Sequence, residues 1–299
     1  MTEDKKGMLA AGLAYCIFGT TYLFSKIALG ITEPAILLCV RFTITFAVLN
    51  LLVLTRAAKV NFRGKKVWGP LVLGLLQPVL YFLLENYGLK YTTASFSGIL
   101  SSSSPILSAI MGAILLRERP TGKQWLCVCV SIAGVLMVSL GGTGGVNTVT
   151  GCLCLLGAFF CGSLYTILVR RLSKMFTSFE MTYLMFAVGF SFFLVFPFFQ
   201  YGGDAVNMLT SALSQWQFVI SAVYLGAFAS VGAYLLVNYS LARLPVTRSA
   251  IFNTFSTVVS VLSGVIILRE PFTWISALAF ALILLGVWGV NRFTEKSAA

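Results

Sequence analysis

Three ionisable side chains stand inside long apolar stretches of the chain, namely Lys26, Arg41 and Glu85. A charge at the centre of a bilayer costs ~2.5–3.5 kcal/mol or more, so such groups usually face a partner or a water-filled cavity. Two interpretations follow from these residue types. Glu85 can form a structural ion pair with one of the cations. Alternatively, the cations bind a substrate carboxylate, and Glu85 binds an ammonium group or a proton.

Polar residues at helical spacing accompany these charges. Gln77, Tyr81 and Glu85 are spaced by four residues, which predicts one polar face of a helix. Similar stripes surround Lys26 in the first apolar run and Tyr234 in the eighth. The residues that we predict to bind substrate are Tyr22, Gln77, Tyr81, Glu85, Ser101, Ser104, Tyr165, Tyr234, Asn238, Asn253 and Ser256.

The residue types needed for catalysis are scarce. The chain has no histidine, its only aspartates are Asp4 and Asp204, and Glu85 is the one carboxylate deep in an apolar run. General acid–base and metal chemistry therefore lack their usual residues. The seven cysteines lie mostly in apolar runs and are interpreted as small hydrophobic fillers. We predict no catalytic residue, no metal site and no cofactor.

The elements that position these residues are predicted to be transmembrane helices. Apolar residues make up 58% of the chain and charged residues 10%, and the apolar runs are continuous rather than alternating. A backbone in hydrocarbon must satisfy its own hydrogen bonds, so such runs form helices of about 20 residues. The ten predicted spans are 8–29, 34–55, 67–89, 94–116, 124–140, 150–169, 179–200, 218–241, 246–268 and 272–290.

Basic residues predict the orientation. With both termini in the cytoplasm, most of the 21 lysines and arginines fall in cytoplasmic segments, and the outer loops keep only Lys90 and Arg269. The net charge of +12 is therefore interpreted as a topology signal and not as a nucleic-acid surface. Gly141–Gly145 is predicted to be an external turn.

An internal repeat divides the chain into residues 1–145 and 146–299. A shift of 152 positions aligns 74–116 with 226–268, and it places Glu270 opposite Glu118. Five helices per half require the two halves to insert in opposite senses. The predicted fold class is therefore an all-α integral membrane protein, with ten transmembrane helices as two inverted five-helix repeats. Such repeats are typical of transporters whose substrate site lies near the bilayer midplane.

The serines of the fourth span share this repeat. Ser97, Ser101, Ser104 and Ser108 form one helix face, and the shift matches them to 249, 253, 256 and 260. Small polar residues also let membrane helices pack closely, so packing and a cavity lining both remain open. Pro105 predicts a kink at this depth, which serves either gating or the shape of the bundle.

Several local motifs carry a family resemblance. They are Pro34 with Arg41-Phe42, the run 86–89 followed by Ala94, Ser104-Pro105, and the Leu-Arg-Glu motifs at 116–118 and 268–270. Because these motifs occur together in this order and spacing, the chain resembles the drug/metabolite transporter superfamily, specifically its EamA-type members. The resemblance covers nearly the whole chain. It implies secondary transport, commonly the export of amino acids and related metabolites. Thr257 stands where the first half has Pro105, so the resemblance does not imply a symmetric pair of kinks.

The sequence therefore predicts a secondary transporter of the cytoplasmic membrane, exporting small amphipathic or zwitterionic metabolites by alternating access. A metabolite importer or exchanger of the same fold remains open, as does a membrane-embedded lipid-modifying enzyme, which the missing acid–base residues disfavour. The expected partners are a small-molecule substrate and the lipid bilayer, without nucleic acid, in a monomer or a homodimer.

Overall fold

The structure is a computed structural model, and it describes residues 3–65, 67–115, 121–140, 148–172, 176–236 and 246–298. All regular elements within these residues are helical. The first half contains α1 (Glu3–Leu29), α2 (Pro34–Leu54), α3 (Trp68–Gly74), η1 (Leu75–Leu80), α4 (Tyr81–Lys90), α5 (Ala94–Ser101), α6 (Ser104–Leu115) and α7 (Gly122–Leu140). The second half contains α8 (Val149–Leu172), α9 (Ser178–Tyr201), α10 (Asp204–Leu213), α11 (Trp216–Val223), η2 (Tyr224–Gly232), α13 (Val246–Ile266) and α14 (Trp274–Ala298).

The apolar runs form helices long enough for a bilayer. Five described stretches are long and apolar enough to cross a membrane, at 6–29, 34–54, 68–90, 179–201 and 216–236. Shorter apolar helices cover 122–138, 149–165, 255–266 and 274–290. Large apolar side chains such as Trp68, Phe199 and Leu285 are exposed on the outside of the bundle, as expected for surfaces that face lipid. The total of ten spans and their inverted arrangement remain predictions.

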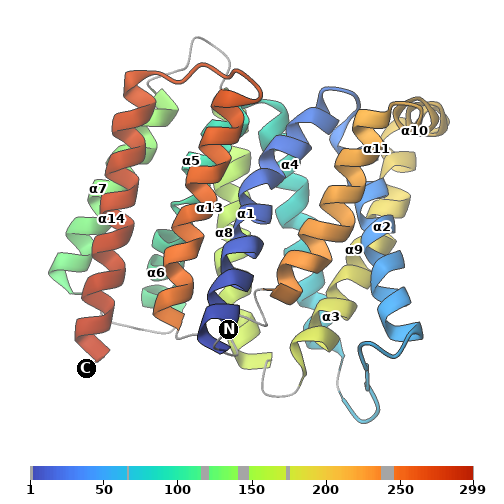
Figure 1. Cartoon of the computed structure of the whole chain (residues 1–299), viewed down its shortest axis with the longest axis horizontal. Coiled ribbons are helices and arrows are strands. Elements are labelled where there is room, and N and C mark those ends of the chain that lie inside the picture. The colour runs from blue at the N-terminus through green and yellow to red at the C-terminus, as the bar shows by residue number, and fades with distance from the viewer. Residues whose placement is uncertain are drawn as a thin grey trace.

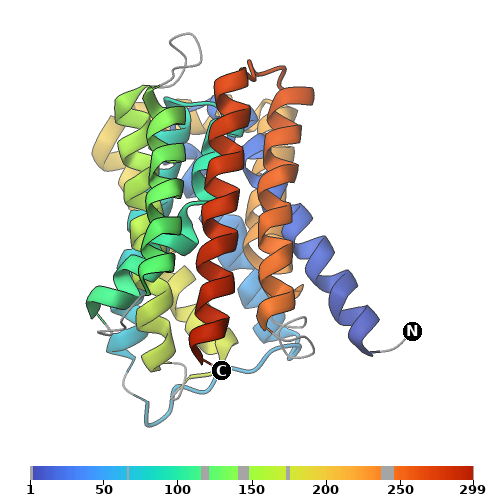
Figure 2. The same cartoon turned by 90° about the vertical axis from the view of Figure 1, so that its left-hand side faces the viewer.

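The long helices run roughly side by side, and the two ends of the bundle differ (Figure 1). α1 begins and α14 ends at one end, which also holds the segment 55–67 and is called the terminal end below (Figures 1 and 2). The opposite end holds the turns 30–33 and 91–93 together with α10, and is called the α10 end. α10 is seen end-on in Figure 1, so it lies across the long helices. This helix was not predicted from the sequence.

Two predicted spans are interrupted. The third span consists of three consecutive helices, α3, η1 and α4. Its regular helical backbone is broken at Gln77, which has φ −142° and ψ 114° and is followed by a cis bond to Pro78. The fourth breaks at Ser102–Ser103 between α5 and α6. The four serines predicted to form one helix face are thus divided between α5 and α6, and α6 begins at Ser104, directly before Pro105. The kink at Pro105 stays a prediction.

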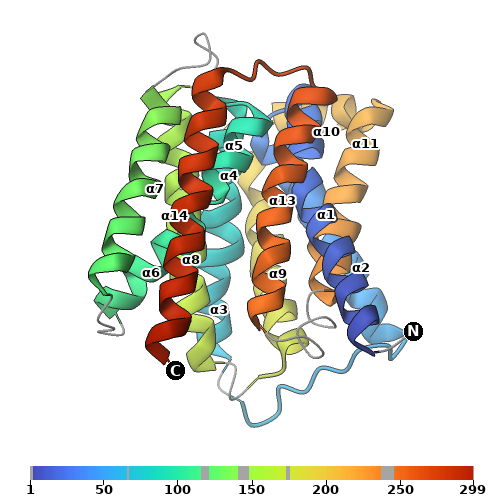
Figure 3. The same ribbon diagram turned by 60° about the vertical axis from the view of Figure 1, so that its left-hand side comes forward.

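Backbone approaches at glycines bring α13 against α1 and α5. A Cβ at Gly19 would lie 2.6 Å from the Ser256 carbonyl oxygen, and one at Gly98 would overlap the Ser260 side chain. A Cβ at Gly264 would lie 2.9 Å from the Ser95 amide nitrogen. Only glycine permits these distances. We call this line of contacts the α13 seam, and Figure 3 shows α13 in front of the bundle beside α1.

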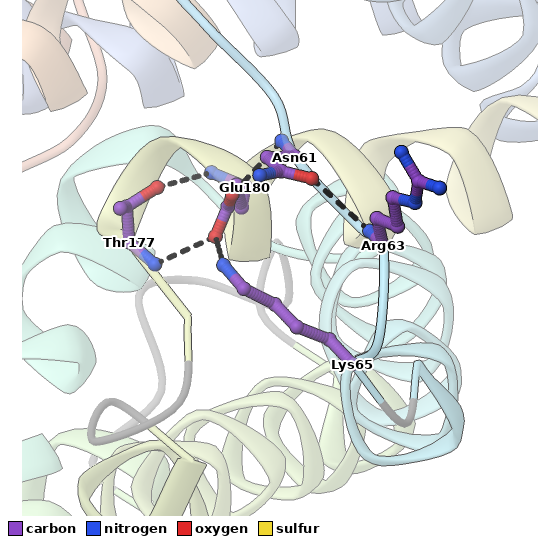
Figure 4. Close-up of polar contacts among 5 residues, drawn as sticks. All are labelled: Asn61, Arg63, Lys65, Thr177 and Glu180. Atoms are coloured by element: carbon purple, nitrogen blue, oxygen red, sulfur yellow. Dashed lines mark hydrogen bonds and ion pairs between the residues drawn. The ribbon is translucent and has the colours of Figure 1, made fainter.

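A buried carboxylate fixes the entrance of α9 at the terminal end (Figure 4). Glu180 is 3% exposed and accepts hydrogen bonds from the Thr177 amide at 3.0 Å and the Asn61 amide at 2.9 Å. Lys65 Nζ adds an ion pair at 2.5 Å. Thr177 and Glu180 form a capping box, which satisfies free amides at the helix start. The same carboxylate thereby ties the segment 55–67 to α9.

Candidate functional site

Glu85 lies in a cluster of hydroxyl groups inside the bundle. The Tyr81 hydroxyl donates a hydrogen bond to Glu85 Oε1 at 3.0 Å. Tyr22 also lies within interaction range of Glu85, Tyr81 and Ser101. Tyr22 is 8% exposed, so this cluster is screened from solvent on the side of α1. Three helices, α1, α4 and α5, thus supply the groups that surround one carboxylate, which we call the Glu85 cluster.

Arg41 is the cation nearest to this cluster, and it is 4% exposed. Its Nε and Nη2 both donate to Ser230 Oγ at 3.3 Å, and its guanidinium carbon lies 4.3 Å above the Phe82 ring. Arg41 and Glu85 interact electrostatically, yet no direct ion pair joins them within the described residues. The structural ion pair predicted for Glu85 is therefore wrong for Arg41.

Lys26 does not pair with Glu85 either. Its ammonium group donates to the carbonyl oxygens of Leu89 at 2.8 Å and Lys90 at 3.5 Å, and also to that of Thr92. The Leu89 and Lys90 carbonyls end α4, where the last turn of a helix has no amide partners and carries partial negative charge, and Thr92 follows in the next turn of the chain. Lys26 therefore caps α4 from one turn beyond Tyr22. Lys90, in turn, forms an ion pair with Glu33 at 2.5 Å.

A narrow cleft lies on the Arg41 side of the Glu85 cluster, with a volume of about 10 Å³, room for about one water molecule. Gln77, Tyr165, Tyr234 and Phe82 line it, so three more of the predicted residues meet at one place. Tyr234 lies within electrostatic range of both Arg41 and Glu85. The irregular backbone at Gln77 places this residue at the cleft although it does not continue the helical stripe of α4. The cleft therefore continues the site from the Arg41 side.

The serines have local partners in this structure. Ser101 Oγ donates to the Gly98 carbonyl at 2.7 Å, and Ser104 Oγ donates to the Ser101 carbonyl at 2.7 Å. Ser163 Oγ reaches the Ser104 carbonyl at 3.2 Å, which connects α6 with α8. Ser256 lies in the α13 seam. Ser101 thus belongs to the Glu85 cluster, whereas Ser104 and Ser256 lie in helix contacts.

Some predicted residues lie outside the part that the structure describes. Asn238 falls between the described ranges, and the side chains of Asn253 and Pro105 are likewise outside it. The two partners of Arg41 were not among the residues predicted to bind substrate. Ser230 is spaced by four from Tyr234 and so shares its predicted helix face, whereas Phe82 gave no signal except its position beside Tyr81.

The arrangement suits recognition of opposite charges. A buried guanidinium with one hydroxyl acceptor can take a carboxylate in a bidentate geometry. A carboxylate held by tyrosine hydroxyls can accept an ammonium group. Among the described residues, no group of three or more metal-binding side chains is present.

Two stretches of the chain, residues 5–140 and 149–292, match the EamA-like transporter family. The chain belongs to the EamA-like transporter family. A relative from Bacillus subtilis (strain 168), the "Uncharacterized transporter YcxC", is 33% identical over 98% of this chain and 95% of its own length. This EamA-like transporter is accordingly a multi-pass membrane protein.

Two further likenesses are informative. The "Probable terminal-alkyne amino-acid exporter" of Streptantibioticus cattleyicolor is 25% identical over 72% of this chain and 69% of its own length. A solved structure titled "Crystal structure of protein" aligns with a TM-score of 0.64 at 19% identity, covering 96% of this EamA-like transporter and 98% of the solved chain. At that identity the second likeness shows the fold alone.

Proposed function

We propose that this EamA-like transporter is a secondary transporter that exports small zwitterionic metabolites, amino acids or related compounds, across the cytoplasmic membrane. Arg41 binds the substrate carboxylate and Glu85 binds its ammonium group. The supporting observation is a buried cation beside the Glu85 cluster, with no direct ion pair between it and the carboxylate among the described residues. Two unpaired charges inside a membrane protein are costly unless other charged groups, such as those of a substrate, pair with them.

The distant likeness to an amino-acid exporter supports the same substrate class and the direction of export. In our proposal the two halves, 1–145 and 146–299, rock against each other around the Glu85 cluster, and both termini face the cytoplasm. Import or exchange would use the same binding geometry, because direction depends on gradients and coupling.

The test uses purified protein in proteoliposomes and a panel of radiolabelled L-amino acids in counterflow, guided by metabolite profiling of cells with and without the protein. The best amino acid is then compared with its amide, which lacks the carboxylate, and its N-acetyl derivative, which lacks the ammonium group. Wild-type protein should prefer the free amino acid to both. Arg41→Gln should abolish the preference over the amide alone, and Glu85→Gln the preference over the N-acetyl form alone.

Arg63→Gln is the matched control, since Arg63 is an exposed basic residue on the segment 55–67. It should keep both preferences. If both derivatives are carried as well as the free amino acid by the wild type, the proposed zwitterion site is wrong. A labelled product that is chemically altered after transport would instead favour an enzyme.

A further inference from the structure

The connection between α13 and α14 holds the start of α5 at the α10 end. Glu270 Oε1 accepts from the Ala94 amide at 2.6 Å, and Oε2 accepts from the Ser95 amide at 2.7 Å and the Ser95 hydroxyl at 2.6 Å. Free amides and the helix dipole make a helix start attractive to a carboxylate. We call these three contacts the Glu270 latch. They join the two halves of the chain across the α13 seam.

The backbone beside the latch is in an unfavourable conformation. Arg269 has φ 53°, in the left-handed region that residues with a side chain seldom adopt. The Glu270 amide donates to the Gly264 carbonyl at 3.1 Å, which turns the chain back at the end of α13. Such strain persists only where surrounding contacts enforce it, and it is common at segments that switch. Releasing Glu270 would release this strain as well.

α5 connects the latch to the Glu85 cluster. Its first residues, Ala94 and Ser95, bind Glu270, and α5 packs against α1 and α4, with its last residue, Ser101, within interaction range of Tyr22. Eight helical residues span about 12 Å, and α5 ends there because the chain breaks before α6. α5 is therefore a short rigid element. The Glu270 latch lies at its first residues, and the Glu85 cluster lies at its last residue.

We propose that the Glu270 latch is the releasable gate of the α10 end, and that α5 carries its state to the Glu85 cluster. The structure has the latch closed. Opening separates Glu270 from Ala94 and Ser95, and the α13 seam parts with it. A substrate that displaces the Tyr22 and Tyr81 contacts of Glu85 shifts Ser101, and so biases the latch. This inference rests on the proposed transport function for its role in a cycle, but the gate itself is testable without any substrate.

The reporter for the gate is Ser97→Cys in a background without the seven native cysteines. Ser97 is 0% exposed and lies two residues beyond the latch on α5. Its rate of labelling by a membrane-impermeant maleimide, in intact cells and in inside-out vesicles, measures how often the α10 end opens. Glu270→Gln removes the charge and presents a donor to the α5 amides. It should speed labelling at least about tenfold, which corresponds to about 1.4 kcal/mol in the gating equilibrium.

Two variants with opposite expectations complete the test. Glu270→Asp keeps the charge but is one methylene shorter, so labelling should be intermediate. Arg269→Gly relieves the left-handed strain while the latch remains, so labelling should be slower than in wild type. Glu33→Gln is the matched control, because it breaks the partly exposed ion pair with Lys90 at the same end. It should change the rate less than twofold.

Equal rates for Glu270→Gln, Glu33→Gln and wild type would overturn the latch. If Glu270→Gln does not fold, Arg269→Gly and Ser95→Ala decide instead: slower labelling in the first and faster labelling in the second support the latch, and any other pattern refutes it. Altered labelling in a protein that transports none of the amino acids would refute the proposed substrate class and leave the gate standing. Zwitterion transport with unaltered labelling in Glu270→Gln would refute the gate and leave the proposed substrate class standing.

Discussion

Adding one methyl group at Gly19 tests whether the α13 seam is as close as its geometry indicates. The new Cβ would lie 2.6 Å from the Ser256 carbonyl oxygen and 2.6 Å from Val259 Cβ. Ordinary contacts begin near 3.4 Å. The carbonyl belongs to the backbone of α13 and cannot rotate away, so Gly19→Ala must push α1 and α13 apart by about 0.8 Å.

Two effects of opposite sign decide the outcome for Gly19→Ala. Alanine favours the helix over glycine by about 1 kcal/mol, whereas overpacking a close contact costs about 1–3 kcal/mol. Because the obstacle is backbone, we expect overpacking to prevail, with a net loss of up to about 2 kcal/mol in the free energy of unfolding. Gly157→Ala is the control, since its Cβ would meet only the flexible end of Leu84 at 3.3 Å.

The assay is unfolding of the purified protein by sodium dodecyl sulfate in mixed micelles, with the melting temperature in detergent as a second measure. Gly19→Ala should unfold at a lower detergent fraction than wild type, and Gly157→Ala should unfold at the same fraction or a higher one. If Gly19→Ala is as stable as Gly157→Ala, then the two helices are further apart than the structure places them, and the argument about the seam fails.

Three other predictions concern the two ends and the middle of the bundle. Glu180→Gln removes the ion pair to Lys65, so trypsin should cut the segment 55–67 several-fold faster than in wild type; an unchanged rate would contradict the role of Glu180 as a tie. Ser104→Trp should abolish transport while the protein still elutes as a folded species, and intact transport would favour packing over a cavity lining. Gly144→Cys should react with an impermeant maleimide added outside cells, and reaction only in inside-out vesicles would refute the predicted topology.

The helical segments and their approximate bounds could be predicted, because long apolar runs in hydrocarbon have few alternatives to the helix. The interruption at Gln77 was missed although Pro78 signalled it, since a proline removes a backbone donor wherever it stands within a helix. In the fourth span the break lies at Ser102–Ser103, before Pro105. α10 was missed because its ten residues are too few and too mixed to read as a span.

The site was predictable by residue type but not by pairing. Helical spacing indicates which side chains share a face, whereas it does not indicate which helix that face meets. Tyr22 and Glu85 are far apart in the sequence, and their contact depends on how α1 packs against α4. Lys26 illustrates this limit. An ammonium group inside an apolar run predicts a partner, and in the structure the partners are backbone carbonyls at and just beyond the end of α4. A pattern of side chains cannot predict such backbone partners.

The glycines of the α13 seam also bear on how well the membrane stays insulated. Water occupies the interior of a protein only where the packing leaves room for it and polar groups bind it. At Gly19, Gly98 and Gly264 the neighbours lie directly against backbone, without a side chain of the glycine between them. A closed gate built in this way leaves little room for a water file, and it opens only when whole helices move.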